Sequence, residues 1–356
     1  MKIIYDNQIF SNQIVGGPSR YFVELIKELI KLNNTPLIVS PIDNNIYLEE
    51  INKKFKKKIN FKVGKKNLLT LSLNKLISKF YFFSLNYDLY HLTYYDNCFT
   101  TKKPKVITVY DLIHEKYFKE FNLDQYPKKK IFKEIDHFLC ISNNTKKDLI
   151  NYYGIDEKKI TVTYLANSII SDNLSKNNFN RPFFLFVGSR KRYKNFNIIL
   201  EAYSKMPEVN KNYDIICFGG GKFIMQETQS MKKLSLNLEN IHHIEGSDKV
   251  LSSLYRYAEA LIYPSKYEGF GIPILEAMSM GCPVISSNSS SLPEVYGNAA
   301  LNFFPDSVDG LIDCMTKIIS DSELKKSQIK KGYERVKNFS WKKCAIETNE
   351  LYKRFS

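Results

Sequence analysis

Two carboxylates and several turn-forming residues lie between Tyr263 and Pro283, in the string YPSKYEGFGIPILEAMSMGCP. The pattern predicts a strand, a glycine loop, a helix over 273–280 with Pro273 in its first turn, and a second strand. In such a unit the loop lies at the carboxyl edge of a parallel sheet, where helix N–H groups can bind phosphate. Glu268 and Glu276 would repel a phosphate, so we expect them to accept hydrogen bonds from sugar or ribose hydroxyls. The alternative is that they are solvated charges on an ordinary connection.

A cluster of cations follows an apolar run at residues 183–187, in the string GSRKRYKN. It contains Arg190, Lys191, Arg192 and Lys194, and it precedes a helix expected over 196–206 with Asn195 as its N-cap. Like charges at a helix N-terminus are unfavourable unless an anion joins them. The cluster is therefore a candidate anion site, or else a solvated basic loop.

The elements that would position these side chains alternate along the whole chain. Apolar runs predict strands at 2–6, 37–40, 87–92, 106–110, 138–142 and 160–164, and then at 183–187, 214–218 and 241–244. Helical patterns lie between the strands. One helix begins at Pro18, after the glycine pair at 16–17, and a capped helix is expected over 142–154. Strands that alternate with helices predict an α/β protein with parallel, doubly wound sheets.

Further candidate residues lie where these strands end and helices begin. Gly16 and Gly17 open a helix and form either an anion cradle or a tight turn. His91, Asp111 and His114 lie at or after strand ends, where a histidine can equally be a structural group. In the second half, Gly219 begins a glycine triplet after one strand, and Gly246-Ser247 follow the next one.

The stretch from Tyr263 to Pro283, together with SSSLPE at 289–294, resembles the C-terminal signature of the retaining, two-Rossmann-domain glycosyltransferases of family 4. The resemblance is dense over 182–300 and looser elsewhere. It implies a GT-B fold, in which two Rossmann-like domains face a central cleft. The expected parts are an acceptor-binding domain over 1–175, a nucleotide-sugar-binding domain over 182–338, and a helix over 339–356 that crosses back to the first domain. A polar segment at 171–181 would be the linker.

The resemblance also implies roles for individual residues. Arg190 and Lys194 would clamp the donor diphosphate, Glu268 would bind donor sugar hydroxyls, and Glu276 would bind the ribose. The expected catalytic residues are Glu268, Arg190, Lys194, Asp111 and His114. The other expected donor contacts are Gly17, Gly219, Ser247, Gly269, Phe270, Gly271, Ile272 and Glu276. The expected acceptor contacts are Gly16, Gly17, His91, Asp111 and His114, although Tyr110 stands where the family commonly has a histidine.

The implied activity is transfer of a hexose from a nucleotide-diphosphate sugar to a glycan or lipid-linked acceptor, with retention of configuration, in surface polysaccharide or lipopolysaccharide assembly. The strings GSRKRYKNF and TVYDLIHE most resemble mannosyl or deoxymannosyl transferases, which makes GDP-mannose the leading donor. The resemblance implies that no cofactor and no metal is needed, and the lack of an Asp-x-Asp motif agrees with this. The alternatives are a sugar-nucleotide epimerase or phosphorylase on the same scaffold, or a basic membrane- or nucleic-acid-binding protein with a vestigial pocket.

Length and composition indicate the number of domains, the state of the cysteines and the kinds of partner to expect. The chain has 356 residues, long enough for two domains, and its six cysteines are scattered, which favours reduced thiols in the cytoplasm. No apolar run is long enough to span a membrane. The net charge is +15, and the run from Lys53 to Lys66 holds eight lysines and no acid. That run predicts either a peripheral contact with anionic lipid or a solvated face; nucleic acid is not expected because no binding motif accompanies the charge.

Overall fold

The computed structural model describes residues 1–43, 45–57, 68–95, 99–117, 119, 128–169, 179–190 and 192–355. It divides into two compact units, one formed by Met1–Leu165 with Ser340–Ser356 and the other by Ala166–Phe339. We call them unit 1 and unit 2. Most of the expected linker, Lys191, and the lysine-rich run beyond Lys57 lie outside the described residues.

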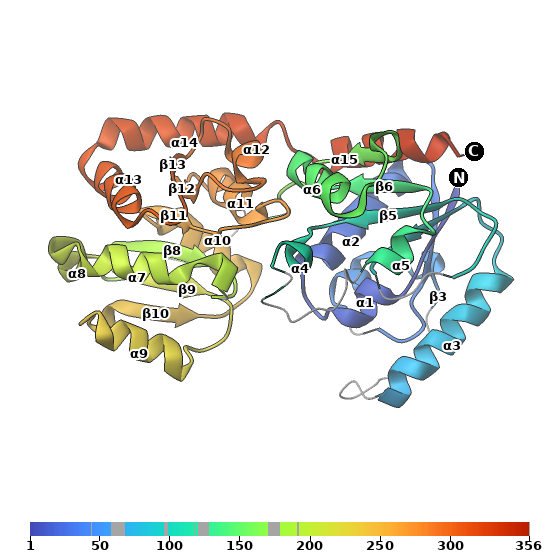
Figure 1. Ribbon diagram of the computed structural model, residues 1–356, viewed down its shortest axis with the longest axis horizontal. Helices are drawn as coiled ribbons and strands as arrows, with labels where there is room; N and C mark the ends of the chain where they lie inside the picture. The colour runs from blue at the N-terminus through green and yellow to red at the C-terminus, as the bar shows by residue number, and fades with distance from the viewer. Residues whose placement is uncertain are drawn as a thin grey trace. The chain divides into compact units, whose positions relative to one another are not determined.

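Unit 1 is built on a seven-stranded parallel sheet in the order β3-β2-β1-β4-β5-β6-β7. Helices lie on both sides of the sheet, as expected for a doubly wound fold (Figure 1). The strands are β1 (Lys2–Tyr5), β2 (Thr35–Val39), β3 (Lys56–Lys57), β4 (Leu89–Leu92), β5 (Lys105–Val109), β6 (His137–Cys140) and β7 (Ile160–Val162). The helices are α1 (Gln8–Asn12), α2 (Gly17–Lys31), α3 (Leu68–Ser84), α4 (Ile113–Lys116), α5 (Lys129–Phe132), α6 (Asn143–Tyr153) and α15 (Trp341–Lys353).

Unit 2 repeats the same arrangement with a six-stranded parallel sheet in the order β10-β9-β8-β11-β12-β13. Its strands are β8 (Phe183–Val187), β9 (Asp214–Phe218), β10 (Ile241–Ile244), β11 (Ala260–Tyr263), β12 (Val284–Ser287) and β13 (Leu301–Phe303). Its helices are α7 (Phe196–Ser204), α8 (Pro207–Asn212), α9 (Met225–Lys233), α10 (Asp248–Tyr257), α11 (Ile272–Ser279), α12 (Leu292–Tyr296), α13 (Val308–Ser320) and α14 (Ser322–Val336).

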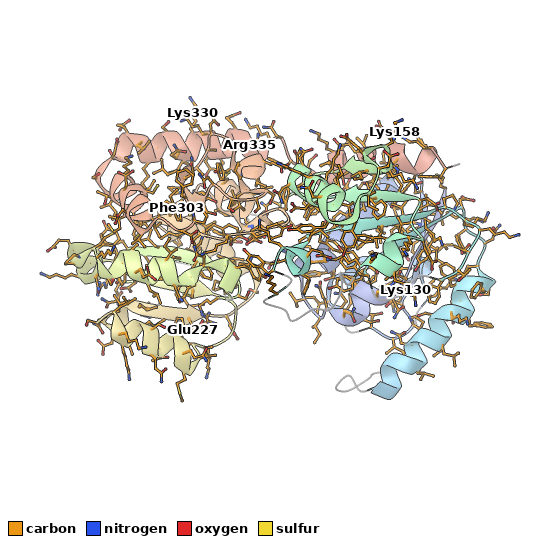
Figure 2. The ribbon with its side chains drawn as sticks, in the orientation of Figure 1. Lys130, Lys158, Glu227, Phe303, Lys330 and Arg335 are labelled. Carbon is orange, nitrogen blue, oxygen red and sulfur yellow. The ribbon has the colours of Figure 1, made fainter. Side chains whose placement is uncertain are left out.

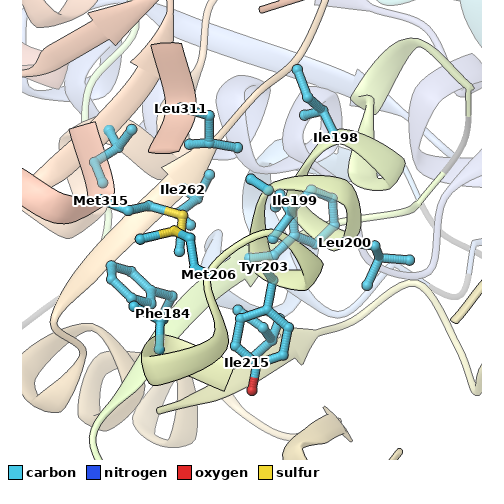
Figure 3. Packing of buried hydrophobic residues seen from close by; sticks show 14 of the residues in the cluster. Phe184, Ile198, Ile199, Leu200, Tyr203, Met206, Ile215, Ile262, Leu311 and Met315 are labelled. Atoms are coloured by element: carbon cyan, nitrogen blue, oxygen red, sulfur yellow. The ribbon is translucent and has the colours of Figure 1, made fainter. Parts of the chain in front are cut away.

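A continuous apolar core holds four helices of unit 2, α7, α8, α9 and α13, to its sheet. Ile199 on α7 and Leu311 on α13 are fully buried and belong to one cluster with Phe184 of β8 (Figure 3). The strands β8, β11 and β12 are buried along their whole length, as expected for parallel strands that are covered on both faces.

The C-terminal helix belongs to unit 1, as expected from the resemblance. α15 packs against α2, and its Tyr352 hydroxyl lies 3.2 Å from the hydroxyl of Tyr5 at the end of β1. Asn349 accepts a hydrogen bond of 2.8 Å from the Asn34 side chain. The terminal helix therefore completes the core of the first unit.

Two local expectations differ from the structure. Asn195 precedes α7, but its side chain does not cap the helix; it donates instead to the carbonyl oxygens of Pro264 and Pro305, which ties the β8–α7 turn to two other loops. The helix α3 was not predicted; it lies between β3 and β4 in the chain and covers 68–84. No helix in the described ranges is long and apolar enough to cross a membrane.

Candidate functional site

An ammonium, a carboxylate and a phenol meet at the carboxyl edge of the unit 2 sheet. Lys194 follows β8, and Glu268 follows the neighbouring strand β11. The Lys194 Nζ atom lies 2.6 Å from Glu268 Oε1 and 3.2 Å from the Tyr263 hydroxyl. Both charged side chains remain partly exposed, at 15% and 12%. The structure thus brings together two predicted residues that lie 74 positions apart.

Tyr263 is the third member of this cluster, and it was not predicted as a site residue. Burial raises the pKa of its hydroxyl well above the ordinary value, and the hydrogen-bonded Glu268 carboxylate raises it further. The phenol therefore stays protonated and can donate to Glu268 while Lys194 is engaged elsewhere. The signal available in the sequence was only that a tyrosine ends the strand before the glycine loop.

The loop that carries Glu268 is held by hydroxyls from the segment between β12 and α12. The Ser290 Oγ atom accepts the backbone N–H of Glu268 at 2.8 Å. Ser291 donates to the carbonyl oxygens of Glu268 and Phe270, each at 2.9 Å. Ser290 adopts a φ of 51°, which is uncommon for a residue other than glycine. The SSSLPE string carries part of the family resemblance, but its pattern predicts no role for these serines.

Glu276 lies on α11, which begins directly after Gly271. It is 6% exposed, and its Oε2 atom accepts a hydrogen bond of 2.9 Å from the buried Tyr255 hydroxyl. Gly271 has a φ of 118°, and a Cβ atom there would lie 2.8 Å from a Leu292 side-chain carbon. The loop can therefore enter the helix at this angle only with glycine at that position.

Arg190 lies in a cage of acceptors rather than beside Lys194. Its Nε atom is 2.7 Å from Glu227 Oε1, and the side chain is 2% exposed. Its other guanidinium nitrogens donate to the carbonyl oxygens of Gly219, Gly221 and Lys222. Glu227 lies in the first turn of α9 (Figure 2). These contacts favour a structural role, in which Arg190 shapes the glycine loop after β9; the predicted diphosphate contact stays a prediction.

Two further predicted donor residues lie at the same edge of the same sheet, whereas Gly17 lies in unit 1. Gly219 follows β9, and the exposed Ser247 follows β10 and precedes α10. The glycine triplet needs its special backbone, because Gly220 has a φ of 75° and a Cβ there would lie 2.7 Å from the carbonyl oxygen of Gly188. Parallel topology alone therefore gathers these residues along one edge.

In unit 1, His91 lies inside the protein, on β4. The side chain is fully buried, and its two ring nitrogens are hydrogen-bonded to the hydroxyls of Tyr352 and Thr108. Burial lowers the pKa of the imidazole to about 3. With both nitrogens occupied, His91 joins α15 to the sheet, which favours the structural alternative over the predicted acceptor contact.

The other predicted acceptor residues lie at the carboxyl edge of the unit 1 sheet. Gly17 begins α2, and a Cβ atom there would meet no other atom within 4 Å. Asp111 follows β5 and accepts the Ile113 N–H at 3.1 Å. His114 lies on the short helix α4.

A buried ion pair holds this part of unit 1 in place. Lys128 Nζ lies 2.8 Å from a Glu115 oxygen, and the two side chains are 4% and 0% exposed. Glu115 is on α4, next to His114. The pair was not predicted, because nothing in the pattern of charged residues around Lys128 indicates that this lysine is buried. Within the described residues, no group of three or more His, Cys, Asp or Glu side chains lies close enough to hold a metal ion.

Comparison with known proteins covers nearly the whole chain. A family model described as Glycosyltransferase Family 4 matches residues 15–166, and one described as Glycosyl transferases group 1 matches residues 170–335. HepE of Anabaena, solved in complex with UDP and glucose, has a TM-score of 0.76 at 16% identity and covers 99% of this chain and 100% of that one. This likeness concerns the fold, and it confirms the expected pair of Rossmann-like domains.

Two relatives are closer in sequence. O-antigen chain mannosyltransferase B of Escherichia coli is 29% identical over 246 residues, which cover 64% of this chain and 64% of that protein. O-antigen chain mannosyltransferase RfbU of Salmonella typhimurium is 34% identical over 174 residues, which cover 49% of this chain and 48% of that protein. The matched segments therefore span between about half and just under two thirds of these relatives.

Proposed function

Because the chain belongs to the glycosyltransferases, with a family 4 module followed by a group 1 module, we propose that it transfers a hexose from a nucleotide-diphosphate sugar to a glycan or lipid-linked acceptor, with retention of configuration. The observation that carries the proposal is the contact of Lys194 with Glu268 at the carboxyl edge of the unit 2 sheet, at 2.6 Å. This edge is where open α/β sheets bind nucleotides.

In the proposed reaction Lys194 acts on the leaving group. As the glycosidic bond breaks, negative charge grows on the nucleoside diphosphate, and an ammonium placed beforehand lowers the energy of that state. Lys194 would move from Glu268 to the diphosphate, while Tyr263 continues to donate to the carboxylate. Glu268 is then able to accept hydrogen bonds from donor sugar hydroxyls. Amides of Gly269 to Ile272 would bind the diphosphate, and Glu276 the ribose.

The proposed donor and setting rest on the relatives, and the proposed acceptor contacts lie in unit 1. Both relatives described above are named mannosyltransferases of O-antigen chains, so we take GDP-mannose as the leading donor and surface polysaccharide assembly as the setting. The acceptor would contact Gly16, Gly17, Asp111 and His114. We propose that the reaction needs no metal and takes place in the cytoplasm, with a peripheral contact to anionic lipid near the Lys53 to Lys66 run.

The first experiment asks which donor the chain binds. GDP-, UDP- and dTDP-sugars are screened for protection against thermal unfolding, where a ligand at 100 times its dissociation constant adds about 2.7 kcal/mol. We expect GDP-mannose to protect. A donor that comes back isomerised would support the epimerase alternative, and protection by none of the donors would contradict the transferase proposal.

The second experiment tests Lys194. We expect Lys194→Met to lower the transfer rate about 100- to 1,000-fold, which is the usual cost of losing one preorganised donor to developing charge. The matched control is Lys205→Met, because Lys205 is an exposed lysine of the same unit. Product anomers are assigned by NMR. Inversion of configuration, or a Lys194→Met variant as active as the control, would contradict the mechanism.

A further inference from the structure

The helix α3 exposes four apolar side chains to solvent, while two polar side chains and one phenylalanine face the protein. Asn74, Ser78 and Phe82 are buried. With 3.6 residues per turn, the exposed apolar residues fall within an arc of about 80° on the opposite side. We call this set the α3 stripe; it consists of Leu73, Leu76, Phe80 and Phe83, which are 48%, 67%, 71% and 58% exposed.

Hydrogen bonds fix the helix in this orientation. The Asn74 amide donates to Ser11 Oγ at 2.7 Å and to the Ile42 carbonyl at 2.9 Å, and its oxygen accepts the Ile42 N–H at 3.1 Å. A rotation that hid the stripe would break all three bonds and leave buried polar groups unpaired. The exposure of the stripe is therefore built into the fold of unit 1. In Figure 1, α3 lies at the edge of that unit.

The sequence around the stripe is strongly basic. Between Glu50 and Asp88 there is no acidic residue. The segment therefore contributes strongly to the net charge of the whole chain, which is +15. Lys79 is exposed on α3 itself, next to the stripe. This segment contains ten lysines, at positions 53, 54, 56, 57, 58, 62, 65, 66, 75 and 79.

We propose that the α3 stripe inserts into the headgroup region of an anionic lipid bilayer. A helix with leucine and phenylalanine on one side and an exposed lysine beside them, preceded by a strongly basic sequence, can lie in the plane of such an interface, where apolar burial and attraction to anionic lipid add together. A second copy of this chain is a poor occupant, because two basic segments would then face each other. Nucleic acid would attract the lysines but offers no apolar surface that covers the stripe.

The place of α3 in unit 1 connects this surface with the acceptor. Ser11 and Ile42, the partners of Asn74, lie in the segments that follow β1 and β2, and so at the carboxyl edge of the sheet. Gly17 lies at the same edge. A lipid-linked acceptor would thus reach unit 1 along the bilayer that α3 contacts. This connection rests on the proposed function, whereas binding to lipid can be measured without any transfer.

The test is flotation of the full chain with vesicles. We expect binding to vesicles of phosphatidylglycerol mixed with phosphatidylcholine and much weaker binding to phosphatidylcholine alone. A Leu76→Ser, Phe80→Ser double variant should bind the anionic vesicles at least about tenfold more weakly, because two large side chains lose their apolar burial. The matched control is Phe304→Ser, since Phe304 is 72% exposed and lies in unit 2. Lys79→Glu should weaken binding about fivefold or more, on anionic vesicles only.

Three results would overturn the inference: no binding to anionic vesicles at low salt, binding of the double variant equal to the control, or loss of self-association in sedimentation with no change in vesicle binding. The last of these would identify the stripe as an interface between copies. Circular dichroism checks that the variants fold. Protection by nucleotide-sugars is measured on the same variants, so that a failed donor site and a failed lipid surface are told apart.

Discussion

Two cations that follow β8 lie in different environments, although the sequence places them four residues apart. Lys194 faces a carboxylate and a phenol at the sheet edge, whereas the guanidinium of Arg190 is enclosed by Glu227 and backbone carbonyls. The cluster of cations is visible in the sequence because its residues are close together in the chain. The sequence does not show which cation has a partner inside the protein, because Glu227 lies 37 residues further on.

The first prediction at this scale concerns Arg190. We expect Arg190→Gln to destabilise unit 2 by about 3 to 5 kcal/mol, because it leaves the Glu227 carboxylate and several carbonyl oxygens without their buried partner. Unfolding by denaturant measures the change. The double variant Arg190→Leu, Glu227→Leu should recover part of the loss. If Arg190→Gln instead keeps wild-type stability and loses affinity for every nucleotide-diphosphate sugar, the diphosphate contact is right and the structural role is wrong.

At the scale of elements, local patterns predicted most of the strands well and missed several helices, among them α3 and α10. The strands of unit 2 up to β10 begin and end where the apolar runs do, since a parallel strand is buried on both faces. For α3 the pattern fails, because leucine and phenylalanine occur around much of the helix and the polar positions Asn74 and Ser78 point inward. A helix that exposes its apolar side does not follow the usual contrast between a buried apolar face and a solvated polar one.

The role of His91 also belongs to this scale, since its partner Tyr352 lies 261 residues away on α15. In the folded protein burial lowers the pKa of His91 to about 3, below its ordinary value of 6.5. The unfolded chain therefore binds a proton below pH 6.5 that the native state does not bind until about pH 3. Stability contributed by the neutral imidazole is lost as the pH falls through this range, by up to about 1.4 kcal/mol per pH unit.

The corresponding prediction uses a variant without the titrating ring. His91→Gln should show a shallower acid dependence of the unfolding free energy than the wild type, with a difference of about one proton. Tyr352→Phe keeps the buried imidazole and should keep the steep dependence. Denaturant unfolding at several pH values below 6.5 gives both slopes. Equal slopes in His91→Gln and the wild type would mean that His91 titrates alike in the folded and unfolded states.

At the scale of the whole molecule, the alternation of strands and helices predicted two α/β units, and the family resemblance predicted the terminal helix that returns to the first. The reason is that alternating strands and helices leave little choice of topology, and parallel strands place their following loops at one edge. The bracing of those loops was not predictable, because Ser290, Ser291 and Tyr263 act through contacts between segments more than twenty residues apart. Which side chain meets which depends on packing that no local pattern encodes.

The return of α15 to unit 1 leads to a prediction about the chain as a whole. A variant that ends at Phe339 loses the ring of Trp341 from its place beside Tyr21 and the hydroxyl of Tyr352 from Tyr5 and His91. Each large side chain removed takes about 1.5 to 3 kcal/mol of burial with it, and the total is comparable to the 5 to 15 kcal/mol that stabilises a typical domain. We therefore expect unit 1 to unfold in this variant.

Unit 2 has its own core and none of its strands comes from the deleted segment, so it should remain folded in the same variant. Hydrogen exchange would then be fast in the amides of β1 and β4 and slow in those of β8 and β11. Nucleotide-sugar should still protect unit 2 against heat, while transfer to an acceptor is lost. A control that ends at Lys353 keeps α15 and should behave as the wild type. If both units exchange together in the shorter variant, each depends on the other for its stability, and donor binding cannot be assigned to unit 2 alone.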